Sequence, residues 1–172
     1  RGISQLNFTI PEGNFVLDPH SVRLVGDVRF FKNDKAVPDP VASGDPIGIS
    51  SKLGVYSLFQ SLIWRSSKHQ TTISHEKNWN RWLSSYMAVT GGMEDQIGHL
   101  GETALTMPNY ELSNDSVVGR DTTSSFCVPM ICGLLQSGQS LPLTSNTLGG
   151  IDLSIMLESD AMALQVFPAD FK

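Results

Sequence analysis

The chain has 172 residues and a mass of 18.8 kDa, with 40% hydrophobic and 17% charged residues. This length favours one domain, and the charged fraction is below the roughly 25% of a typical globular domain. The 12 basic and 17 acidic residues give a net charge of −5, which argues against general nucleic-acid binding because that function needs a basic surface. No apolar run approaches the ~20 residues of a membrane-spanning helix.

Most of the chain shows a two-residue alternation of apolar and polar residues, which predicts β-strands. The longest pattern covers residues 22–31, where the even-numbered residues are apolar, and the cleanest covers residues 151–158, where the odd-numbered residues are apolar. In chain order, strands are expected at 6–10, 15–17, 22–31, 56–64, 126–132, 151–158 and 162–167, with weaker candidates at 103–107, 110–112 and 116–118. The long, turn-rich stretches 32–51 and 90–101 are expected to be loops that face solvent or partners.

One segment, residues 78–89, breaks this pattern. Its apolar residues lie three or four positions apart, and therefore share one helical face: Trp79, Trp82, Leu83, Tyr86 and Met87. Asn78 can cap the start of this helix and Gly91 can end it. We expect the apolar face to pack against the protein's own sheets.

Strands that do not alternate with helices argue against a parallel α/β sheet. Short strands with frequent turn signals, such as Asp18-Pro19 and Gly149-Gly150, instead predict an all-β, antiparallel sandwich or barrel with one short inserted helix at about 78–89. The two halves differ in charge: residues 1–86 carry 10 basic and 7 acidic residues, net +3, and residues 87–172 carry 2 basic and 10 acidic, net −8. This allows a head-to-tail contact between copies, although ordinary surface variation is the simpler interpretation.

Cys127 and Cys132 are the two cysteines, and both lie in the strand expected at 126–132. Five residues along a strand span ~16 Å, whereas a disulfide needs Cα atoms ~4.4–6.8 Å apart. We therefore expect two free thiols.

The sequence contains no motif for nucleotide binding, zinc proteolysis or serine hydrolysis. His20, His69, His75 and His99 have spacings that suit no standard zinc site. Three groups of residues are candidate sites, and each has a simpler structural interpretation: His75-Glu76 at a helix entry, Cys127 as a core thiol, and Asp18, Asp39 and Asp45 in proline turns. We predict no catalytic residue, no cofactor-binding residue, no metal ligand and no enzymatic activity.

Several segments, taken in order, resemble the major capsid proteins of double-jelly-roll viruses, the lineage of polinton-like viruses, virophages and large nucleocytoplasmic DNA viruses. The segments are LNFTI (6–10), FVLDPHSVRL (15–24), GVYSLFQSL (54–62), WNRWLSSY (79–86), FCVPM (126–130), LPL (141–143) and IDLSIMLE (151–158). They resemble the strands and the short helix of that family's upstream jelly roll. Tyr56 and Trp79 replace more usual residues, and 172 residues hold only one of the family's two jelly rolls.

The resemblance implies an antiparallel jelly-roll β-sandwich that covers residues 1–172 as a single domain, either complete in itself or half of a longer two-jelly-roll chain. It implies a structural capsid protein of an icosahedral shell, located in the virion and assembled inside the infected host cell. Its partners would be other copies of itself, most simply as trimers, and other capsid proteins. No cofactor and no direct nucleic-acid binding are expected, and membrane contact is left open.

The residues leave a second function open, that of a cell-surface or secreted β-sandwich binding module, lectin-like or cytokine-like. That function would require a signal peptide, glycosylation at the sequons of Asn7 or Asn114, and usually a disulfide. An enzyme on a jelly-roll scaffold is a weaker third candidate, because the clustered histidines of a cupin-type site are missing.

Overall fold

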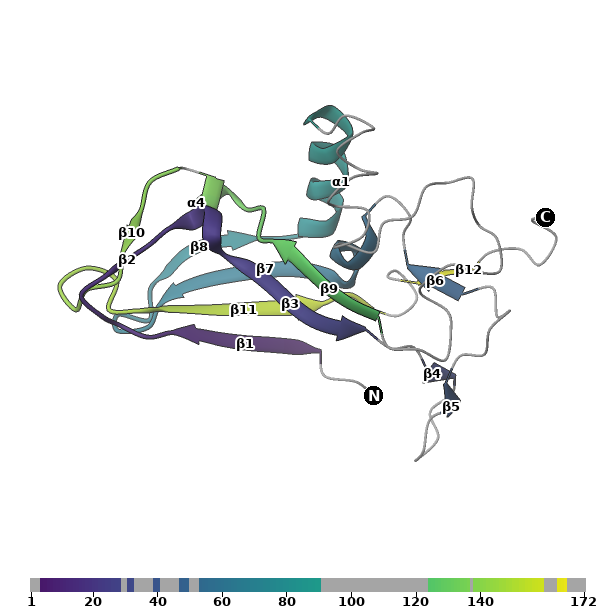
Figure 1. The fold of residues 1–172 in the computed structure, drawn as a ribbon, viewed down its shortest axis with the longest axis horizontal. Coiled ribbons are helices and arrows are strands. Elements are labelled where there is room, and N and C mark those ends of the chain that lie inside the picture. Colours follow the sequence, from purple (N-terminus) through teal and green to yellow (C-terminus); the bar gives the residue numbers. More distant parts are fainter. Residues whose placement is uncertain are drawn as a thin grey trace.

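The computed structural model describes residues 4–28, 31–32, 39–40, 47–49, 53–90, 124–136, 138–159 and 164–166. This part of the chain is mostly β, and every strand pairs antiparallel with its neighbours (Figure 1). The expectation of an all-β, antiparallel protein is confirmed at this level. The weaker strand candidates between residues 103 and 118 lie outside the described residues.

The largest sheet has four strands in the order β1 (Gln5–Ile10), β11 (Ile151–Leu157), β7 (Phe59–Ser66) and β8 (Thr72–Glu76). β11 and β7 are therefore central, and β1 and β8 are the edges. As the sequence pattern predicts, Ile151, Leu153 and Ile155 are buried along β11, because odd-numbered residues of a strand share one face.

Two further pairs repeat the pairing of an early strand with a late one. β2 (Val16–Leu17) pairs with β10 (Leu141–Pro142), and β3 (Arg23–Val28) pairs with β9 (Ser124–Pro129). With the β1–β11 pair included, the first, second and third strands pair with β11, β10 and β9, which is the reverse of their chain order. Such nested antiparallel pairs follow from one long β-ribbon that doubles back on itself.

Smaller pairs and helices complete the described part. β4 (Phe31–Lys32) pairs with β5 (Asp39–Pro40), and β6 (Ile47–Ile49) pairs with β12 (Leu164–Val166). The expectation that the whole stretch 32–51 is loop is wrong, because β5 and β6 lie within it and pair with β4 and β12. The helix α1 covers Trp79–Thr90, within one residue of the expected 78–89. Three short helices were not expected: η1 (Pro19–Ser21), η2 (Gly54–Leu58) and α4 (Gly133–Gln136).

Two of these short helices shorten expected strands. The strand expected at 56–64 begins only at Phe59, because the Tyr56 N–H donates to the Leu53 carbonyl and closes a turn. The strand expected at 126–132 ends at Pro129, because the Cys132 carbonyl accepts the N–H groups of Leu135 and Gln136 and starts α4.

One buried cluster joins the four-stranded sheet, the β3–β9 pair and α1. Leu24 and Val128 come from β3 and β9, whereas Leu62 and Trp64 come from β7. The central sheet and the β3–β9 pair thus share a core, and α1 projects away from the sheets at one end (Figure 1).

The helix contributes only part of its expected face to this core. Trp79, Leu83 and Met87 are buried, but Trp82 is 41% exposed and Tyr86 is only partly buried. The expectation that Trp82 packs against the sheets is wrong. The apolar face of the helix is wider than the area that the sheets cover. Trp82, three positions after Trp79, therefore remains at the surface.

Candidate interaction site

The histidines, cysteines and carboxylates are the residues whose side chains could act in catalysis or metal binding. His20, His69 and His75 are exposed, and the described residues hold no group of three His, Cys, Asp or Glu that could bind a metal ion. Asp18 caps η1, where its Oδ1 accepts the His20 N–H at 3.0 Å, as its place beside a proline indicates. His99, Asp45 and the side chain of Asp39 lie outside the described residues.

Both cysteines are free thiols. Cys132 is buried, and burial raises the pKa of its thiol to about 11. Such a thiol stays protonated near neutral pH and is a poor nucleophile. Cys127 pairs in register with Val25, which is exposed, so Cys127 lies on the outward face of the β3–β9 pair. The expectation that Cys127 is a core thiol is therefore wrong, and of the two cysteines only Cys132 belongs to the core. The structure brings neither thiol into a nucleophile pair with a described histidine.

Two aromatic residues hydrogen-bond to the end of β9 and to the segment that follows it. The Trp79 Nε1–H donates to the Ile131 carbonyl at 2.7 Å, and the Tyr56 hydroxyl donates to the Pro129 carbonyl at 2.9 Å. The Tyr56 and Trp79 rings meet edge to face, with centroids 5.5 Å apart. The Phe59 ring also contacts the Trp79 ring, with centroids 6.1 Å apart. Burial raises the pKa of Tyr56, so its hydroxyl remains a neutral donor.

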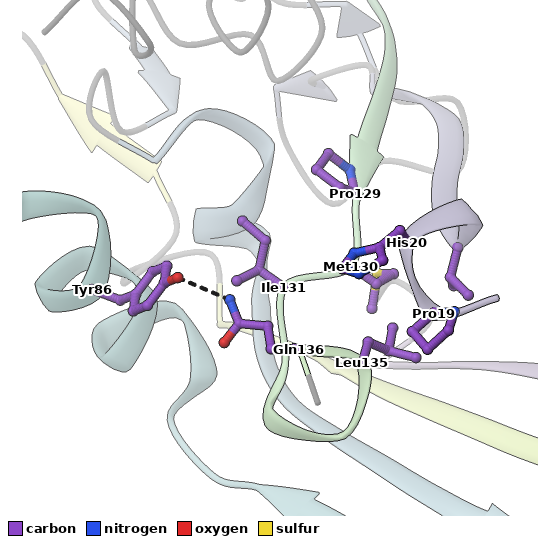
Figure 2. Close-up of a pocket in the computed structure, with 9 residues that line it drawn as sticks. Pro19, His20, Tyr86, Pro129, Met130, Ile131, Leu135 and Gln136 are labelled. Carbon is purple, nitrogen blue, oxygen red and sulfur yellow. Dashed lines mark hydrogen bonds between the residues drawn. The ribbon is translucent and has the colours of Figure 1, made fainter. Parts of the chain in front are cut away.

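Next to this segment lies a pocket of about 440 Å³ (Figure 2). The Gln136 Nε2 donates to the Tyr86 hydroxyl at 3.0 Å and links α4 to α1 along one side. The lining contains no Lys, Arg, Asp or Glu, and is formed by Pro19, His20, Val22, Tyr86, Pro129, Met130, Ile131, Leu135 and Gln136. The lining therefore combines apolar side chains with three polar ones, His20, Tyr86 and Gln136.

Apolar side chains are exposed at several separate places on the described surface. Trp82 stacks on Tyr86 with ring centroids 5.2 Å apart, beside the pocket. The large exposed apolar residues are Phe8, Phe15, Val16, Val25, Trp82, Val89 and Met156. Scattered exposed apolar residues are ordinary, so position rather than number decides their meaning.

Phe8 has the most informative position. Its cross-strand partner is Leu153, which is buried, so Phe8 points to the core face of the sheet. It is nevertheless 42% exposed, because β1 is an edge strand and no described strand lies beyond it. The edge of β1 is therefore the candidate interaction site.

The opposite face of β1 and β11 is polar and internally hydrogen-bonded, apart from the exposed Met156 at one end. The Thr9 hydroxyl and the Ser67 hydroxyl both donate to Asp152 Oδ1, at 2.9 and 2.8 Å. The Ser154 hydroxyl donates to Asn7 Oδ1 at 2.8 Å. These bonds hold the exposed side chains of β1 in place, so its edge is an ordered surface.

The sequence pattern identifies neither β1 nor the pocket as a site. The segment 6–10 was expected as a strand, but its position at a sheet edge depends on pairing with β11, 140 or more residues away. The pocket gathers residues from four separate segments. The only available signal was the complete absence of charged residues in QLNFTI.

No protein-family model, curated protein or solved structure matches this chain. Among the described residues, no helix has the length and apolar character needed to cross a membrane.

Proposed function

We propose that this chain is a structural viral capsid protein with a jelly-roll fold, whose copies assemble into the capsomers of an icosahedral shell. The observation that carries the proposal is the nested pairing of β1 with β11, β2 with β10 and β3 with β9. A jelly roll is a long antiparallel ribbon rolled into a sandwich, and nested pairs are its expected signature. The ordered sequence resemblance to double-jelly-roll capsid proteins points to the same fold independently.

The surface chemistry supports assembly. Only 17% of the residues are charged, and low charge suits a domain that covers much of its outside with neighbours. The exposed apolar side chains include one at the edge of the large sheet, Phe8, and one on the outward face of the β3–β9 pair, Val25. The position of Val25 suits side-by-side contact between upright jelly rolls, most simply in a trimer, and the edge that carries Phe8 suits a second contact between copies.

Light scattering across a concentration and salt series tests this function. We expect concentration-dependent association that persists at 1 M salt and forms more slowly there, because the screening length falls from ~10 Å at 0.1 M to ~3 Å at 1 M. Apolar and backbone contacts survive that change, whereas charge steering between the +3 and −8 halves does not. A monomer at every salt and protein concentration would contradict the proposal.

A further inference from the structure

Within the described part of the chain, the strand β1 uses its backbone hydrogen-bonding groups on one side only. The Leu157 N–H donates to the Ser4 carbonyl at 2.9 Å, and these two residues are directly opposite in the β1–β11 register. In antiparallel pairs, hydrogen-bonded and non-hydrogen-bonded positions alternate, so even-numbered residues of β1 bond to β11. Odd-numbered residues direct their N–H and C=O groups to the free edge: Gln5, Asn7 and Thr9. Within the described residues these groups have no backbone partner.

Nothing in β1 prevents another strand from adding to this edge. Natural edge strands are usually protected by charges, prolines or bulges. The opposite edge, β8, has such protection: its register with β7 is irregular between Trp64 and Arg65, and it contains His75 and Glu76. β1 reads QLNFTI, without charge, proline or glycine, and its register with β11 is regular along its whole length.

We propose that β1 of one copy pairs antiparallel with β1 of a second copy, about a two-fold axis that passes beside Asn7. This register places Asn7 opposite Asn7 of the second copy, and Gln5 opposite Thr9. It uses every free backbone group of the edge, in about six hydrogen bonds. It also sets Phe8 beside Leu6 of the second copy, in a position without backbone bonds where side chains lie closest.

A second copy fits this edge better than an unrelated strand for two reasons. The odd-numbered groups form a set that is complementary to itself under two-fold rotation, which is the requirement for an interface between identical surfaces. In addition, the chain carries a net charge of −5, yet β1 has no charged residue, so two copies meet there without like charges directly opposite. The inference rests on the proposed function, in which this contact would join neighbouring capsomers across a two-fold axis.

The proposed register can be tested by charge substitution at the axis. Asn7→Lys alone places two lysines opposite each other, and Asn7→Glu alone places two glutamates there, so each should weaken dimer formation by about fivefold or more. An equimolar mixture of the two variants should restore association, because lysine then faces glutamate. The matched control is Gln5→Lys, which faces Thr9 and should associate like the wild type. Analytical ultracentrifugation measures each sample, and circular dichroism confirms that the exposed substitutions leave the fold intact.

A second variant acts on the backbone. Asn7→Pro removes an N–H that points away from β11, so it should block strand addition while the β1–β11 hydrogen bonds remain. The proposal is overturned if Asn7→Lys and Asn7→Pro associate like the wild type, or if the Lys and Glu variants fail to recover on mixing. If the wild type assembles and both variants assemble equally well, this contact is overturned but the capsid function is not. If the wild type forms dimers that never grow into larger particles, the contact is supported and the capsid function is contradicted.

Discussion

β7 and β1 belong to one sheet, but they meet very different surroundings. β7 is paired on both sides, with β11 and β8, and it buries Leu62 and Trp64 completely. β1 is paired only with β11 among the described strands, and leaves Phe8 largely exposed although that residue points to the core face. The centre of the sheet therefore carries the buried core, whereas its β1 edge has no partner strand among the described residues.

The same division occurs within α1, at a smaller scale. Trp79 is buried and donates its Nε1–H to Ile131, whereas Trp82 is exposed and contacts Tyr86 on the surface. The two residues are the same amino acid, so their positions relative to the core, and not their hydrophobicity, explain why one is buried and the other is exposed.

The largest effect should separate the two strands directly. Trp64→Ala in β7 should lower the free energy of unfolding by about 3–5 kcal/mol, because it removes a fully buried aromatic side chain. Phe8→Ser in β1 should lower it by about 1 kcal/mol or less, and should instead weaken association. Chemical denaturation and sedimentation of both variants measure the two properties. Equal stability losses would remove the distinction between centre and edge.

The two tryptophans of α1 should show a similar contrast. Trp79→Ala should cost about 3–5 kcal/mol, since it loses both core packing and the bond to Ile131. Trp82→Ala should cost about 1 kcal/mol, which is the usual value of an aromatic pair at a partly exposed site. Urea denaturation followed by circular dichroism compares them, and a loss at Trp82 as large as at Trp79 would contradict the observed exposure.

The edge strand β8 should give the protein a pH dependence through Glu76. Burial raises the pKa of this carboxyl above its usual 4.5, although its Oε1 accepts the Gly133 N–H at 2.7 Å. The folded state thus holds the proton more tightly than the unfolded state, so stability should fall as pH rises from 4.5 through the raised value. Glu76→Gln should flatten this slope and keep the bond to Gly133. Thermal melts of both proteins from pH 4 to 8 measure how the melting temperature changes with pH. The same change in both proteins would exclude Glu76 as the cause.

The smallest expected effect is a difference in rate between the two thiols. Cys127 lies on the outward face of the β3–β9 pair and Cys132 is buried with a pKa of about 11. In the native protein a thiol reagent should therefore modify Cys127 first, while denatured, unreduced protein should show two reactive groups. Mass spectrometry after timed labelling identifies the order. Faster labelling of Cys132 would show that the described position of α4, directly after this cysteine, is wrong.

The sequence predicts correctly the elements that are marked by a periodic pattern within a single segment. The alternation in residues 151–158 gave β11 and its buried face, and the helical spacing in residues 78–89 gave α1 within one residue. Residues 22–28 also alternate as expected, with Leu24 buried and Val25 exposed.

Features that depend on distant contacts could not be predicted in this way. The helix α4 follows an apolar run that was expected to be a strand, and Glu76, 57 residues earlier, accepts its first N–H. The exposure of Trp82 depends on how far the sheets extend beneath α1, which helical spacing does not contain. Likewise, the sequence of β1 predicts a strand, but only its pairing with β11 makes that strand an edge.

Negative-stain electron microscopy of the purified chain tests the central claim most directly. If the paired centre forms the fold and the edges serve assembly, the protein should appear as trimers, hexagonal arrays or closed shells. A field of single, unassociated particles at every protein concentration would contradict the account.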